Sequence, residues 1–172
     1  MSLFDKSSGG GWEGRLKGLL PVLGHRNWIV VTDAAYPAQS NPGIETLYTG
    51  EDHVEVLGKV AAAIAAARHI RANIYLDAEL NDVPEADAPG VNRLREQIGK
   101  ALNGQSIHTL EHEQIIARLD QSARLFNVVI LKSTLTIPYT SVFFELDCGY
   151  WNAEAEKRLR ESLREEPVAA RG

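Results

Sequence analysis

A histidine and an aspartate bracket one apolar segment near the start of the chain, in the stretch GHRNWIVVTDAAYPAQS at residues 24–40. Histidine titrates near neutral pH and can accept or donate a proton. A carboxylate can bind hydroxyl groups and can shift the protonation of a nearby histidine. His25 and Asp33 are therefore candidate functional residues at the two ends of one predicted strand.

Each of these residues also has a simpler interpretation. Asp33 stands where a strand should end, which is where ligand sites of open α/β sheets lie. An aspartate at such a place also commonly caps a turn. His25 follows a glycine that ends a helical pattern, and a lone histidine in a loop is usually solvated or packed.

Further candidates lie in the second half of the chain. His112 stands near the start of a predicted helix, EHEQIIARL, and faces inward with Ile116 and Leu119. A helix N-terminus favours a neutral imidazole, which can transfer protons, although a buried histidine with a backbone partner fits the same position. Tyr139, in IPYTS, can hydrogen-bond to a ligand or anchor the loop, and Ser141 begins the next strand.

The motifs of several other enzyme classes are absent from the sequence: GxGxxG after a strand, GxxxxGK[ST], GxSxG and HExxH. HTLEHE brings His and Glu close together, but helical geometry does not give a metal triad, so no metal is expected. The formal charge of −5 disfavours a nucleic-acid binder. No apolar run reaches the roughly 18 residues that span a bilayer, and no signal-peptide pattern opens the chain. With Cys148 as the single cysteine, these features predict a cytoplasmic protein.

Strands alternate with helices along the 172 residues, which predicts an α/β fold in one three-layer domain with a mixed or largely parallel central sheet. Residues 1–11 are expected to be a flexible lead-in, residues 12–150 the domain, and residues 151–172 a charged helix and tail. The expected strands are 27–34, 72–80, 106–110, 127–132 and 141–148, and the expected helices are 12–24, 51–69, 91–102, 111–126 and the one after 151.

Three motifs in this order, LGHRNWIVVTDAAYPAQS, HEQ and IPYTSVFF, resemble the ribose pyranase/fucose mutarotase family (RbsD/FucU) over about residues 16–149. In that family a Gly-His pair precedes a strand ending in Asp-Ala, and a Tyr-x-Asn triplet precedes the last strand. The resemblance implies that His25 is the catalytic acid/base. It also implies that Asp33, His112, Tyr139 and Ser141 bind the substrate.

The resemblance further implies an RbsD-like fold and a cofactor-independent isomerase that interconverts anomers or ring forms of a monosaccharide. It implies a homo-oligomer, a ring-shaped decamer in the ribose branch, with sites near subunit boundaries. The loop DAAYPAQS is closer to the fucose branch, whereas HEQ is closer to the ribose branch. On this interpretation the strand between His25 and Asp33 sets both groups around one sugar ring.

One departure from the family pattern concerns Ser141, which replaces the asparagine of the triplet. An amide donates and accepts at once, while serine is shorter and reaches less far. Two alternatives to a mutarotase therefore stay open. One is a protein of the same fold that binds a monosaccharide without turning it over, and the other is an isomerase acting on a modified or acidic sugar.

Overall fold

The computed structural model describes residues 11–165, so residues 1–10 of the predicted lead-in (1–11) and residues 166–172 of the predicted tail lie outside the described residues, while Gly11 begins the first helix. Six strands and five helices lie in this range, with a short 3-10 turn at Ala78–Asn81. The strands are β1 (Trp28–Thr32), β2 (Ile44–Tyr48), β3 (Ile70–Asp77), β4 (Ile107–Leu110), β5 (Val128–Lys132) and β6 (Val142–Cys148). The helices are α1 (Gly11–Leu19), α2 (His53–Ala66), α3 (Val91–Ala101), α4 (His112–Ala123) and α5 (Ala153–Glu165).

The six strands form one sheet in the order β2-β5-β1-β6-β3-β4. β6 runs antiparallel to both of its neighbours, β1 and β3, and every other pairing is parallel. Five strands therefore point the same way, and their carboxyl ends lie at one edge of the sheet. The predicted α/β fold with a mixed, largely parallel sheet is confirmed.

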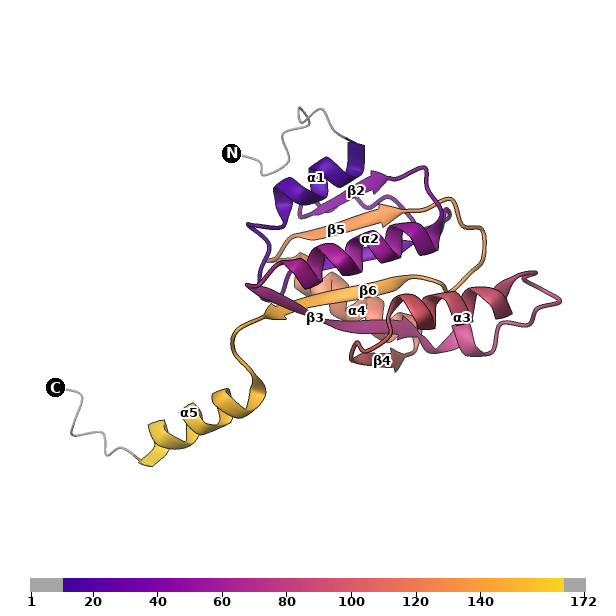
Figure 1. The fold of residues 1–172 in the computed structure, drawn as a ribbon. Helices are drawn as coiled ribbons and strands as arrows, with labels where there is room; N and C mark the ends of the chain where they lie inside the picture. The colour runs from indigo at the N-terminus through magenta and orange to yellow at the C-terminus, as the bar shows by residue number, and fades with distance from the viewer. Residues whose placement is uncertain (1–10, 166–172) are drawn as a thin grey trace.

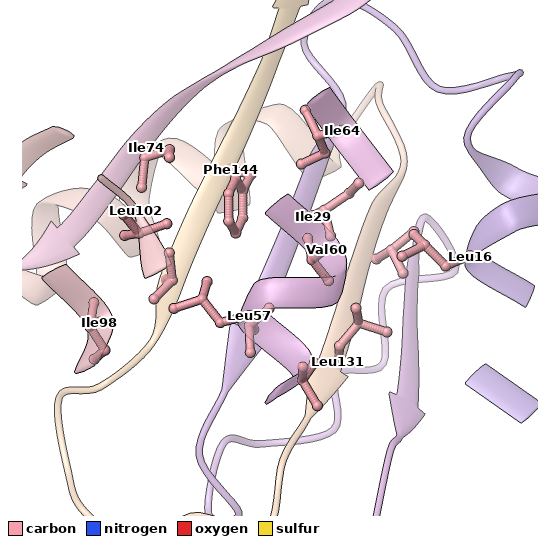
Figure 2. Close-up of a cluster of buried hydrophobic side chains, with 14 of the residues drawn as sticks. Leu16, Ile29, Leu57, Val60, Ile64, Ile74, Ile98, Leu102, Leu131 and Phe144 are labelled. Atoms are coloured by element: carbon pink, nitrogen blue, oxygen red, sulfur yellow. The ribbon is translucent and has the colours of Figure 1, made fainter. Parts of the chain in front are cut away.

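β1 is buried along its whole length because both faces of the sheet are covered. Ile29 and Val31 pack on one face with α1, α2 and α3, while Trp28 and Val30 pack on the other with α4. This alternation follows from the two-residue period of a strand. Figure 2 shows part of the first cluster, in which side chains of the sheet meet those of α1, α2 and the end of α3.

Two local predictions differ from the structure. The buried face of α4 carries Ile115, Leu119 and Ala123, so Ile115 rather than Ile116 points into the core. The edge strand β2 was not among the expected strands, and only its first residue, Ile44, is buried. Because an edge strand leaves most of its side chains partly exposed, it shows little of the apolar pattern on which strand prediction depends.

The ends of α1 and α5 lie at the limits of the domain. α1 stops at Leu19, two residues before Pro21, since a proline inside the next turn would clash with the preceding carbonyl. α5 leaves the end of β6 and extends away from the sheet (Figure 1). Within residues 11–165 no helix has the length and apolar character needed to cross a membrane.

Candidate functional site

The carboxyl ends of the parallel strands meet at one edge of the sheet, which we call the carboxyl edge. Because β6 runs the other way, its first residue lies at this edge as well. Ligand sites of open α/β sheets lie beyond such an edge. Four polar residues are placed there by strand ends: Asp33 after β1, Asp77 at the end of β3, His112 shortly after β4 and Ser141 before β6.

His112 and Asp77 form a hydrogen-bonded pair at the carboxyl edge. Nδ1 of His112 lies 3.0 Å from Oδ1 of Asp77, and the Asp77 side chain is fully buried whereas that of His112 is 28% exposed. Burial raises the pKa of the Asp77 carboxyl, and the hydrogen bond with His112 acts in the opposite direction. A carboxylate at Nδ1 orients the imidazole and favours the tautomer that presents a lone pair on Nε2. The pair is therefore suited to proton transfer.

Glu79 fixes the backbone at the same place. Both of its carboxylate oxygens accept from the backbone N–H of His112, at 3.1 and 3.0 Å. Glu111, which precedes α4, makes no capping hydrogen bond with its own side chain, so Glu79 supplies the negative charge at this helix N-terminus. The segment that ends β3 thus holds His112 through both its ring and its backbone.

Tyr36 lies against the carboxylates of the same edge. Burial, together with the nearby charges of Asp120, Asp77 and Asp33, raises the pKa of its hydroxyl to about 12. Oδ2 of Asp77 is buried without a hydrogen-bond partner among the described residues. An unsatisfied buried polar atom costs about 1–3 kcal/mol, so this atom would gain from a polar ligand or from a small rearrangement that brings a partner.

Tyr139 stands beside His112 in an unusual backbone conformation. Its φ of 57° lies in the left-handed region, which residues other than glycine rarely adopt. The turn is held by Thr140, whose Oγ1 donates to the carbonyl of Ile137 at 2.9 Å. The Tyr139 ring, 43% exposed, meets the imidazole of His112 edge to face with 5.8 Å between ring centres. The turn thus places an aromatic ring beside the His112–Asp77 pair.

Ser141 is 4% exposed and lies deeper in the same edge. The next residue, Val142, pairs with Val31 of β1 and Leu76 of β3, which places Ser141 between the ends of those strands. Asp33 and Asp77 follow Val31 and Leu76 closely along the chain. The structure therefore brings together Asp33, His112, Tyr139 and Ser141, four of the five residues singled out in the sequence.

His25 lies at the opposite edge of the sheet. Its ring Nδ1 is 2.8 Å from Oδ1 of Asp147, near the end of β6, and its side chain is 59% exposed. The five residues of β1 separate it from Asp33, which at about 3.3 Å per residue is a distance of about 16 Å. The expectation that β1 sets His25 and Asp33 around one sugar ring is therefore wrong within a single chain.

A third histidine, His53, is fully buried at the start of α2. Its Nδ1 lies 2.9 Å from Oγ of Ser133, which in turn donates to the carbonyl of Thr32 at 2.7 Å. Because the Ser133 hydroxyl proton is used on Thr32, Nδ1–H of His53 is the donor to Ser133. Burial lowers the pKa of this histidine, so it is held neutral behind the ends of β1 and β5.

The described residues supply hydrogen-bonding and acid/base groups rather than a metal donor set. No group of three or more His, Cys, Asp or Glu side chains with a metal-binding arrangement occurs in residues 11–165. The His112–Asp77 pair would provide only two ligands, fewer than the three or four that protein zinc sites use. Cys148 is half-buried and forms no disulfide.

The sequence matches one protein-family model over most of the described residues. The family model described as the RbsD / FucU transport protein family matches residues 13–145, more than half of the chain. The chain belongs to the RbsD/FucU family. The recognition from sequence motifs is confirmed, and α5 lies beyond the matched residues. No curated protein sequence matches the chain significantly.

Solved structures of RbsD/FucU proteins share the fold. Bacillus subtilis RbsD, solved in complex with D-ribose, is 20% identical with a TM-score of 0.53, and the match covers 85% of this chain and 99% of that chain. A fucose mutarotase from Streptococcus pneumoniae, solved with L-fucose, is 20% identical with a TM-score of 0.50, covering 77% and 91% of the two chains. At this identity the likeness establishes the fold.

Two residues of the carboxyl edge were missed from the sequence. Asp77 ends the strand IYLD just as Asp33 follows the strand IVVT, so the rule that selected Asp33 would have selected Asp77 too. Tyr36 stands in a proline-containing loop and carries no local signal, because its burial depends on the packing of α4 against the sheet. Both belong to the candidate site as the structure shows it.

Proposed function

We propose that this RbsD/FucU protein is a cofactor-independent monosaccharide mutarotase or pyranase. The supporting observation is the gathering of Asp33, His112 and Tyr139 at the carboxyl edge, with the His112 ring held by the buried carboxylate of Asp77. Such an edge offers several hydrogen-bonding groups and one oriented imidazole, which suits a polyhydroxyl ligand that must gain and lose protons. The ribose and fucose complexes of its structural relatives agree with a sugar ligand.

The reaction requires one acid and one base. A base removes the proton of the anomeric hydroxyl, the bond from the anomeric carbon to the ring oxygen breaks, and an acid protonates that oxygen. Reclosure on the other face, or by another hydroxyl, gives the other anomer or ring size. A histidine near neutrality suits either role at pH 7, with no cofactor.

His25 is proposed as the catalytic acid/base, and Asp33, His112, Tyr139 and Ser141 as the groups that bind the sugar. Since His25 lies at the opposite edge of the sheet, it can reach the same sugar only if it comes from a neighbouring subunit. The proposed site is therefore shared between two copies in a homo-oligomer, up to a decamer. Asp147 would orient the ring of His25 as Asp77 orients that of His112.

A sugar-binding protein without turnover is the second candidate, and Ser141 is the observation that favours it. This side chain is almost completely buried and is shorter than the asparagine of the family triplet. A sugar hydroxyl that the amide would contact loses a partner here. Binding would then persist through Asp33 and His112 while ring opening slows.

Saturation-transfer NMR tests the proposal and separates the two candidates. Exchange between the ring forms of ribose, fucose, galactose and glucose is recorded with and without protein. Faster exchange of one sugar, abolished by His25→Ala and retained in the exposed control Arg93→Gln, supports the mutarotase. Binding signals without faster exchange support the sugar-binding protein, and unchanged exchange in His25→Ala refutes the catalytic role of that residue.

A further inference from the structure

The residues from Tyr150 to Arg160, which we call the C-terminal extension, line one side of an open cavity that also contains His25. This cavity, of about 640 Å³, lies between the turn that precedes β1, the end of β6 and the start of α5. Its volume falls within the roughly 300–1,000 Å³ of small-molecule sites. Trp151 and Arg160 contribute to its lining from beyond residue 145, where the family match ends. Figure 1 shows α5 continuing from β6 next to this end of the sheet.

Both carboxylates of the cavity are already engaged with cations. Asp147 binds Arg71 through Oδ2 at 2.7 Å, and Glu156 binds Arg160 through Oε1 at 2.7 Å. Partial burial acts against ionisation of Asp147, yet the backbone N–H of Cys148 and the Arg71 guanidinium hold its pKa below the ordinary value. The acidic side chains are therefore neutralised by the protein itself.

Arg26 is the third arginine of the cavity, and it has no carboxylate partner among the described residues. Its guanidinium lies 5.5 Å from the centre of the Phe126 ring. Three arginines thus face two carboxylates, which leaves the lining with one net positive charge when His25 is neutral. The uncompensated charge is on the residue next to His25.

The backbone at Arg26 is held in an unfavourable conformation. Its φ of 75° lies in the left-handed region, where a residue with a side chain costs of order 1–3 kcal/mol. Two hydrogen bonds fix the turn. The backbone N–H of Arg26 donates to the carbonyl of Leu146 at 2.9 Å, and the backbone N–H of Gly24 donates to Oδ1 of Asn27 at 2.7 Å. A glycine or asparagine would satisfy this turn with less strain, so an arginine here points to a role of its side chain.

The aromatic residues of the extension complete the lining. Trp151 is 44% exposed, and its Nε1 donates to Glu156 at 2.8 Å, which holds the indole at the side of the cavity. Arg160 binds the other oxygen of Glu156, so the three side chains form one network on the extension. An indole face packs against the apolar face of a sugar ring, and a guanidinium pairs with a carboxylate through two parallel hydrogen bonds.

We propose that this cavity takes an acidic monosaccharide, with the carboxylate of the sugar on Arg26 and the sugar ring against Trp151. The inference rests on the proposed function for the sugar class, and it narrows that class to sugars bearing a negative charge. His25 stands in the same cavity, so in the proposed shared site this cavity would face the carboxyl edge of a neighbouring subunit and one sugar would contact both. The extension beyond the family match is then the element that sets substrate specificity.

Calorimetric titration of matched sugars tests the charge preference. Galacturonate differs from galactose in carrying a carboxylate, and it is expected to bind roughly tenfold tighter or more, as suits a hydrogen-bonded charge pair. Arg26→Asn removes the guanidinium and keeps a residue that accepts left-handed backbone, so it should fold and lose the preference. The control Arg93→Gln, which replaces an exposed arginine of α3, should keep the preference for galacturonate. Trp151→Ala should weaken the binding of both sugars by a similar factor.

The outcomes separate this inference from the proposed function. Equal affinity for galacturonate and galactose, or a preference that survives Arg26→Asn, overturns the inference even if neutral sugars exchange faster with the protein. A preference that depends on Arg26 supports the inference. If that preference is found without faster exchange of any sugar, the cavity binds acidic sugars and the mutarotase proposal fails. Raised salt should shrink a preference that arises from charge.

Discussion

Nδ1 of His112 lies 3.0 Å from Oδ1 of Asp77, and this pair joins the start of α4 to the end of β3. The aspartate is buried while part of the imidazole reaches solvent. Because the Asp77 carboxyl is buried, its ionisation costs free energy. The same carboxyl orients the ring of His112. This combination of an unfavourable environment and a defined partner is typical of functional sites, which links the pair to the proposed chemistry.

The first prediction concerns the orientation of His112. Asp77→Asn is expected to slow ring-form exchange about tenfold or more, because an amide can donate to Nδ1 and favour the wrong imidazole tautomer. His112→Ala, which removes one of the sugar-binding groups altogether, should slow exchange about 100-fold or more because the sugar is no longer held in position. Exchange rates from saturation transfer measure both. Equal rates in wild type and Asp77→Asn would contradict the orienting role of the carboxylate.

The same substitution has an expected effect on stability that depends on pH. Because burial raises the pKa of Asp77 above 3.8, its contribution to folding is complete below that value and is lost as the pH rises through the raised pKa. The asparagine of Asp77→Asn cannot ionise, so the variant does not lose this contribution to stability as the pH rises. The free energy of unfolding of the variant should therefore increase relative to wild type as the pH rises from about 3.8 through the raised pKa. Urea unfolding at several pH values measures the difference, and a difference independent of pH would refute it.

The second prediction concerns His53. Its pKa is lowered from 6.5 by burial, so its contribution to stability is present above pH 6.5 and is lost as the pH falls towards the lowered pKa. His53→Gln should weaken the decrease in free energy of unfolding on acidification below pH 6.5. His108→Gln is the matched control, since His108 is exposed against the ring of Tyr75. Identical pH profiles for the two variants would show that His53 is not the group responsible.

The sequence predicts well those elements whose side-chain pattern is complete. The helix 91–102 has all four of its expected apolar residues buried, Val91, Leu94, Ile98 and Leu102. β1 is apolar throughout because it is covered on both faces. β2 lies at an edge of the sheet and shows neither the helical spacing of apolar residues nor a continuous apolar run. For β2, the missing apolar pattern follows from its position at the edge of the sheet, where most of its side chains stay partly exposed.

The candidate site was only partly predictable, for reasons of chain geometry. The positions of His25 and Asp33 on either side of a five-residue strand already require that they lie far apart, since a strand is extended. The pairing of His112 with Asp77 depends on β3 and β4 lying side by side, which joins residues 35 positions apart. No local pattern reports such a contact.

The third prediction tests the shared site. His25→Ala and His112→Ala should each be nearly inactive alone. When the two are unfolded together and refolded as a mixture, sites that combine an intact His25 from one copy with an intact His112 from the other should form. Random mixing would restore up to about one quarter of the wild-type exchange rate, whichever symmetry relates the copies. Mixing without refolding is the control.

Recovery of activity in the mixture would also require an oligomer. Light scattering on the wild type is therefore measured at the concentration of the exchange assay. A monomer at that concentration, or no recovery in refolded mixtures that contain both variants in one particle, would contradict a site shared between subunits.

The last prediction places the end of the folded domain between Gly149 and Trp151. Removing residues 151–172 is expected to change the thermal midpoint by less than about 2 °C, because Trp151 and the side chains of α5 up to residue 164 are exposed or half-buried and the removed helix covers little of the core. Gly149→Ala should instead destabilise the protein by about 1–3 kcal/mol. A Cβ at Gly149 would lie 2.7 Å from the carbonyl oxygen of Arg68 and 2.8 Å from that of Ile70, so the backbone would have to move.

Gly99→Ala provides the matched control for this substitution. Nothing lies within 4 Å of a Cβ at Gly99, and the residue is inside α3, so alanine there should be neutral or stabilising by up to about 1 kcal/mol. Thermal and urea unfolding of the truncated chain and of the two glycine variants, each compared with wild type, measure these effects. A truncated chain that unfolds many degrees below the full chain would show that α5 belongs to the folded domain. Removing α5 would then remove core contacts rather than an element that sets specificity.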